Sequence, residues 1–161
     1  MFLFSFGTRP EIIKQFPLIQ EMNSRKIPYK TVFSGQHEDL IKDFIDLIGQ
    51  PDYFFENIIT HGQSLNRLVS KILESSDKLL NQNTDFKIIV QGDTSTAFAL
   101  ALAGFQNGND VIHVEAGLRT HNLQSPFPEE ANRTLVSKLA NFHFCPTQRS
   151  VDNLSTEGIN K

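Results

Sequence analysis

Short apolar runs alternate along the chain with segments whose apolar residues recur every three or four positions. The runs contain few polar positions, which is typical of strands that are covered on both faces. They predict strands at Phe2–Phe6, Tyr29–Ser34, Lys87–Val90, Val111–Val114 and Phe142–Cys145.

The segments between these runs have the periodicity of amphipathic helices. The stripes are Ile12–Ile19, which Pro17 is expected to kink, Leu40–Ile48, Leu65–Leu73, Ala97–Ala101, a helix that starts at Pro128, and a last helix near Ser150–Gly158. Alternation of strands and helices is typical of parallel βαβ units. The pattern therefore predicts an α/β fold with a doubly wound parallel sheet, in one domain that spans residues 1–161.

Charge and cysteine usage narrow the class of protein. The formal net charge is -3 and Lys and Arg form no run, so no nucleic-acid partner is expected. Cys145 is the one cysteine, which fits a reducing compartment and predicts a cytoplasmic protein. The apolar opening Met1–Phe6 is short and has no basic start, so we interpret it as a buried strand and expect no membrane association.

Four polar loops follow predicted strands. They are Gly7–Glu11, Gly35–His37, Gln91–Thr94 and Glu115–Arg119. Ligands of open parallel sheets bind beyond the carboxyl ends of the strands. We therefore expect these loops to open onto one crevice.

The first loop has the features of an anion-binding turn. Gly7 permits a tight turn, Pro10 suits a helix start, and the Arg9 guanidinium suits a phosphate group. Pairing of Arg9 with Glu11 is the alternative interpretation. The loop is not the glycine-rich dinucleotide fingerprint, because the Gly-x-Gly-x-x-Gly spacing is absent.

Two acidic residues follow later strands. Asp93 is either the N-cap of the next helix or a proton-transfer group that faces the crevice. Glu115 comes directly after a buried strand, which favours a functional role. Arg119 is expected either to neutralise Glu115 or to bind a phosphate group.

The helix that begins near Pro128 has two acidic residues in its first turn. A purely structural role would explain these two acidic residues. Both would interact favourably with the helix dipole, and Glu129 would pair with Arg133. Since Glu129 and Glu130 point to different sides, we expect at most one of them to face the crevice. No spacing of Cys and His predicts a metal site.

Taken together, five motifs resemble one family. They are Gly-Thr-Arg-Pro-Glu at 7–11, Gly-Gln-His at 35–37, Gly-Asp-Thr at 92–94, His-Val-Glu-Ala-Gly-Leu-Arg at 113–119 and Pro-Glu-Glu-Ala-Asn-Arg at 128–133. The family is that of the non-hydrolysing UDP-N-acetylglucosamine 2-epimerases. Hydrolysing relatives diverge after the Gly-Thr-Arg of the first motif, whereas this chain keeps Pro10 and Glu11.

The resemblance implies a Rossmann-like amino-terminal half of a GT-B arrangement, a UDP-sugar substrate and a homodimer. It implies that the carboxy-terminal domain, which supplies the other wall of the active site, is absent from this chain, so the chain alone would be inactive. The catalytic acids would be Asp93, Glu115 and Glu129. The substrate-binding residues would be Arg9, Gln36, His37, Arg119 and Arg133.

The family interconverts UDP-GlcNAc and UDP-ManNAc, usually for polysaccharide synthesis, and the resemblance implies no cofactor. Three alternatives stay open: an epimerase for another UDP-HexNAc, a GT-B glycosyltransferase, and a non-catalytic module that binds nucleotide sugars.

Overall fold

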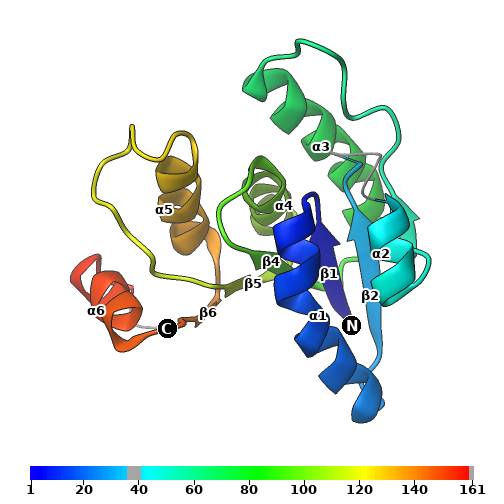
Figure 1. Ribbon diagram of the computed structural model, residues 1–161, viewed down its shortest axis with the longest axis horizontal. Coiled ribbons are helices and arrows are strands. Elements are labelled where there is room, and N and C mark those ends of the chain that lie inside the picture. The colour runs from blue at the N-terminus through cyan, green and yellow to red at the C-terminus, as the bar shows by residue number, and fades with distance from the viewer. Residues whose placement is uncertain (36–40, 160–161) are drawn as a thin grey trace.

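A computed structural model describes residues 1–35 and 41–159, in which six parallel strands form one sheet (Figure 1). The strands are β1 Phe2–Phe6, β2 Tyr29–Phe33, β3 Tyr53–Phe54, β4 Lys87–Gln91, β5 Asp110–Val114 and β6 Phe142–Phe144. The helices are α1 Arg9–Ser24, α2 Ile41–Ile48, α3 Leu65–Leu80, α4 Ser95–Gln106, α5 Glu129–Leu139 and α6 Gln148–Thr156. The strand order is β3-β2-β1-β4-β5-β6, which is the classical doubly wound order.

The predicted fold class is confirmed, and all five predicted strands are present within a residue or two of their expected ends. Strand β3 escaped prediction because its two residues are too few to show any period. It pairs with β2 through Val32 and Phe33. Helix α1 is continuous from Arg9 to Ser24 and includes Pro17.

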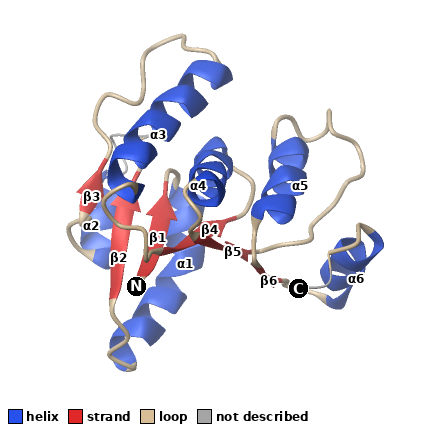
Figure 2. Ribbon diagram, turned by 180° about the vertical axis from the view of Figure 1, so that it is seen from behind, coloured by secondary structure: helices blue, strands red, loops and turns tan. Residues whose placement is uncertain are grey.

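The side chains of successive strand residues point to opposite faces of the sheet, so they belong to two different hydrophobic cores. Leu3 and Ile88 belong to the core beneath α3, α4 and α5, whereas their neighbours Phe4 and Ile89 belong to the core beneath α1 and α2. Figure 2 shows the same two layers from behind, with α1 and α2 on the far side of the strands. Most of the apolar helix positions are core positions, as their periodicity predicts, but Ile13 of α1 and Leu65 of α3 are 54% and 43% exposed.

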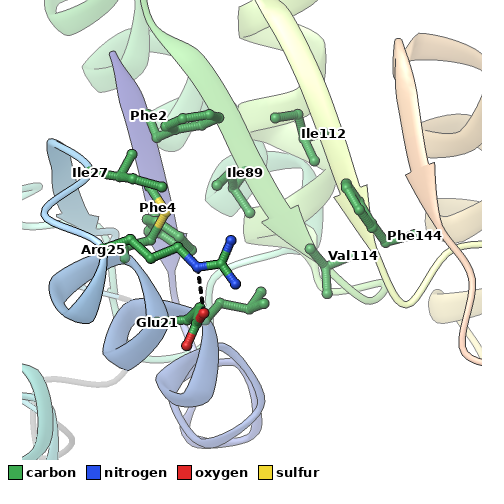
Figure 3. A pocket seen from close by; sticks show the side chains of 11 residues that line it. Phe2, Phe4, Glu21, Arg25, Ile27, Ile89, Ile112, Val114 and Phe144 are labelled. Carbon is green, nitrogen blue, oxygen red and sulfur yellow. Dashed lines mark hydrogen bonds and ion pairs between the residues drawn. The ribbon is translucent and has the colours of Figure 1, made fainter.

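The face of the sheet beside α1 is open toward β6. An apolar groove of about 330 Å³ lies there (Figure 3), and its lining residues are Phe2, Phe4, Leu18, Glu21, Met22, Arg25, Ile27, Ile89, Ile112, Val114 and Phe144. Phe142 and Phe144 of the edge strand β6 are 50% and 62% exposed. The apolar runs predict strands that are covered on both faces. Within the described residues this prediction is wrong for β6, because α1 and α2 pack farther along the sheet.

Candidate active site

The loops after β1, β4 and β5 share one pocket of about 430 Å³. Its lining residues are Thr8, Pro10, Glu11, Lys14, Gln91, Gly92, Asp93, Thr94, Glu115, Leu118 and Arg133. β1 and β4 are the adjacent strands at which the chain order reverses, and such a switch point is where doubly wound sheets bind ligands. The expected convergence is therefore confirmed for three of the four loops. Gln36 and His37 of the remaining loop lie outside the described residues.

At the start of α1 the Glu11 carboxylate accepts hydrogen bonds from the backbone donors of the turn. Its Oε2 accepts hydrogen bonds from the backbone N–H groups of Gly7 at 2.8 Å and Thr8 at 2.6 Å, and Oε1 accepts from the Thr94 hydroxyl at 2.7 Å. Burial raises the pKa of Glu11, and these hydrogen bonds oppose the rise. Glu11 thus connects the β1 and β4 loops. The phosphate expected at this turn would depend on the exposed Arg9 rather than on these donors.

Asp93 is not the N-cap of α4. That position belongs to Thr94, whose hydroxyl accepts from the N–H of Ala97 at 3.0 Å. The Asp93 carboxylate instead pairs with Arg133, and its side chain is 25% exposed. Burial raises the pKa of Asp93; the Arg133 charge opposes the rise, and the carboxylates of Glu129 and Glu115 add to it.

Glu115 lines the same pocket, in a backbone conformation that non-glycine residues rarely adopt. Its φ is 66°, in the left-handed region. The carboxylate accepts a hydrogen bond from Lys14 Nζ at 2.6 Å and another from the Gln91 amide. Backbone strain at one residue that faces a pocket is typical of a functional site, since the surroundings must hold it.

The two acidic residues at the start of α5 have different environments, as expected. Glu130 is 1% exposed and accepts from the N–H groups of Thr120 at 2.8 Å and His121 at 2.9 Å. Glu129 is half-buried and close enough to Asp93 to raise its pKa. The ion pairs of Arg133 are with Asp93 and with Glu130, which lies three positions earlier on α5.

Arg119 does not neutralise Glu115, which was one of the two roles expected for it. Its side chain is 1% exposed, and its guanidinium donates to Glu157, the C-cap of α6, through Nε at 2.7 Å and Nη2 at 2.9 Å. Lys14 is the cation that pairs with Glu115. The burial of Arg119 and its pairing with Glu157 argue against direct contact between its guanidinium and a phosphate group.

Sequence reasoning missed Lys14, Gln91 and the role of Glu11 in joining the loops. One signal was present: Glu11 and Lys14 are three positions apart, so they lie on one side of α1. Over the residues that the structure describes, no cluster of three or more Cys, His, Asp or Glu side chains could hold a metal ion. Within those same ranges, no helix has the length and apolarity that crossing a bilayer requires.

The pocket brings carboxylates and cations together at the switch point of the sheet, the place where doubly wound folds bind ligands such as nucleotides. A family model described as UDP-N-acetylglucosamine 2-epimerase matches residues 20–161. The chain is 46% identical over 159 residues to the UDP-N-acetylglucosamine 2-epimerase of Salmonella borreze, and 43% identical over 164 residues to that of Campylobacter jejuni. The chain belongs to this family.

A solved relative has the same fold. The structure of UDP-GlcNAc 2-epimerase from Neisseria meningitidis bound to UDP-GlcNAc superimposes with a TM-score of 0.90 at 41% identity, and the match covers 98% of this chain and 43% of that one. The matches cover 98% and 99% of this chain but 42% of the Salmonella and Campylobacter relatives. The chain thus spans less than half the length of the relatives it matches.

Proposed function

We propose that this chain forms the amino-terminal half of the active site of a non-hydrolysing UDP-N-acetylglucosamine 2-epimerase, which interconverts UDP-GlcNAc and UDP-ManNAc. The observation that carries the proposal is the placement of Asp93 and Glu115 in one pocket, each paired with a cation from a different helix. A carboxy-terminal domain like that of the relatives would close the pocket from the other side. The intact enzyme would act as a homodimer.

The reaction inverts C2 of the sugar, a carbon whose proton is not acidic. In the proposed route UDP leaves C1 with the bonding electrons, and a carboxylate removes the C2 proton, which leaves a C1–C2 double bond in 2-acetamidoglucal. UDP then adds back to C1 while a protonated group returns a proton to the other face of C2. Two acid–base groups on opposite sides of the ring are therefore needed.

Asp93 and Glu115 suit these two roles because they differ in environment. The raised pKa of Asp93 favours a carboxyl that can hold a proton, since burial and two neighbouring carboxylates disfavour its charge. Glu115 accepts hydrogen bonds from Lys14 and Gln91, which support a negative charge. Glu129 would stabilise the positive charge that develops on the ring as UDP departs.

The proposed substrate-binding residues are the cations and the loop after β2. Arg9 would bind the diphosphate, Arg133 would orient Asp93, and Gln36 with His37 would contact the substrate from the loop. Lys14 beside Glu115 adds a positive charge to the pocket wall. Because these groups form only one wall, the isolated chain would bind UDP-sugars weakly and would not turn them over.

The test uses the intact enzyme, meaning this chain continued by the carboxy-terminal part that its relatives have. Incubation with UDP-GlcNAc alone in deuterated water should give UDP-ManNAc with deuterium at C2. Net hydrolysis, or transfer that requires an added acceptor, would contradict the proposal in favour of a glycosyltransferase. Binding without any reaction would favour a non-catalytic module, and epimerisation of only another UDP-HexNAc would change the substrate.

A further inference from the structure

A partly buried ion pair joins the segment after β5 to the C-terminal end of α6. The Arg119 guanidinium donates to both carboxylate oxygens of Glu157, and it also donates to the Ser137 hydroxyl at 3.0 Å and to the carbonyl of Leu118 at 2.8 Å. Planar two-point pairing of this kind fixes direction as well as distance. The hydrogen bond from Arg119 lowers the pKa of Glu157, so the pair stays charged at neutral pH.

Two further contacts attach the same segment to the same helix. The side-chain amide of Asn153 donates to the carbonyl of Gly117 at 2.9 Å. A Cβ on Gly117 would lie 2.2 Å from the carbonyl oxygen of Ser150, so the two backbones approach more closely than any other residue would allow. Lys138 of α5 donates to the carbonyl of Glu157 at 2.7 Å, which secures the end of α6.

The other end of this segment is Glu115, whose strained backbone needs support from its surroundings. The N–H of the next residue, Ala116, donates to the carbonyl of Phe144 in β6 at 3.0 Å. The short segment from Glu115 to Arg119 is thus held by β6 at one end and by α6 at the other. A shift of α6 would be transmitted through this short, fixed segment to the Glu115 carboxylate.

We propose that Arg119 and Glu157 are positioning residues, whose ion pair fixes α6 to the segment 115–119 and thereby sets the position of the Glu115 carboxylate. The inference rests on the proposed function, in which Glu115 transfers a proton. It gives Arg119 a role at a distance from the substrate, in agreement with its burial.

The first experiment measures the attachment itself. Glu157→Gln keeps the shape of the side chain and removes its charge. The matched control is Glu21→Gln, which weakens the exposed pair between Glu21 and Arg25, an Arg–Glu pair that does not line the candidate active-site pocket. Hydrogen exchange of the intact enzyme should rise in the segment 115–119 for Glu157→Gln and stay at the wild-type level for Glu21→Gln.

The second experiment asks whether the pair acts through Glu115. In the intact enzyme Glu157→Gln should lower kcat by about 10- to 100-fold with little change in KM, because small misplacement of a reacting group is costly. In a Glu115→Gln background the same substitution should change the residual kcat by less than about 2-fold. A purely structural defect would lower kcat to the same extent in both backgrounds, and that result would overturn the proposal.

Asn153→Ala is the variant to use where Glu157→Gln does not fold. It removes one hydrogen bond to Gly117 and should raise exchange in the same segment. Unchanged exchange in the segment for either folded variant would overturn the inference. Failure of the proposed function is a separate outcome: wild-type enzyme would then not epimerise UDP-GlcNAc, and exchange alone would decide whether the pair fixes the segment.

Discussion

Arg133 on α5 donates to the carboxylate of Asp93 in the loop after β4, and the two residues are 40 positions apart in the chain. The side-chain amide of Asn132 donates to the carbonyl of the same Asp93 at 2.8 Å. Both the backbone and the carboxyl of Asp93 are therefore held by one helix. Glu129 at the start of that helix adds negative charge nearby, which helps to raise the pKa of Asp93.

Asp93→Asn should separate chemistry from stability. In the intact enzyme kcat should fall by about 100-fold or more, because Asn keeps the shape of Asp but cannot transfer the proton. The unfolding free energy should change little, since Thr94 rather than Asp93 caps α4. Epimerisation, deuterium incorporation at C2 and denaturant unfolding measure the two effects.

Thr94→Ala is the control for the capping role. It should lower the unfolding free energy by about 1 kcal/mol or more, because it removes both the cap and the hydrogen bond to Glu11. Near-normal turnover in Asp93→Asn would rule out Asp93 as a proton-transfer group and leave Arg133 as its structural partner.

The strand positions, the parallel arrangement of the sheet and the shared pocket could be predicted from the sequence because they follow from local patterns. Apolar runs reveal strands, and the carboxyl ends of parallel strands must meet at one edge. The partners of Arg119 could not be predicted in this way. Its ion pair with Glu157 depends on how α6 packs against the loop, and no local pattern in either segment indicates that contact.

The same limit explains the revised interpretation of Asp93. Both Asp93 and Thr94 are good N-cap residues, so composition cannot choose between them. The choice depends on which backbone conformation the turn at Gly92 adopts, with φ of 70°. Once that turn is fixed, Thr94 caps α4 and Asp93 faces Arg133.

Lys14→Met should impair the reaction through Glu115. The substitution removes the cation that contacts the Glu115 carboxylate at 2.6 Å but keeps much of the length of the side chain. We expect kcat in the intact enzyme to fall by about 10-fold or more, the scale on which loss of electrostatic support or position affects a reacting group. Lys14→Arg, which keeps the charge, should retain more activity.

Lys30→Met is the matched control for Lys14→Met. Lys30 forms a similar 2.6 Å ion pair with Asp52, at a distance from the pocket lining. Equal effects of the two substitutions on kcat would show that Lys14 has no special relation to the reaction.

His113 should make stability depend on pH. Burial lowers the pKa of His113 to about 4, against an ordinary value of 6.5, and its ring Nε2 contacts the carbonyl of Gly92 at 2.8 Å. Because the unfolded chain takes up the proton first, stability is full above pH 6.5 and falls as the pH drops toward 4. The full loss from this group is about 3 kcal/mol.

His113→Gln should flatten this decrease, since Gln does not titrate, and denaturant unfolding at several pH values measures the difference. Exposed His61 supplies the control, and His61→Gln should keep the wild-type slope. The raised pKa values of Glu11 and Asp93 act in the opposite sense, because their protonation favours the folded state as pH falls. The comparison of variants at each pH removes their contribution.

Gly117→Ala tests the close approach of α6 to the segment after β5, by comparison with Gly108→Ala. Both glycines have positive φ, 85° and 76°, so both substitutions place Ala in an unfavourable backbone conformation. That strain alone costs about 1–2 kcal/mol. A Cβ at Gly108 would meet nothing within 4 Å, whereas one at Gly117 would lie 2.2 Å from the carbonyl oxygen of Ser150.

Gly117→Ala should therefore lower the unfolding free energy by more than Gly108→Ala does, and hydrogen exchange should rise along α6 only in Gly117→Ala. Equal destabilisation by the two substitutions, with unchanged exchange along α6, would mean that α6 can move away from Gly117 without cost.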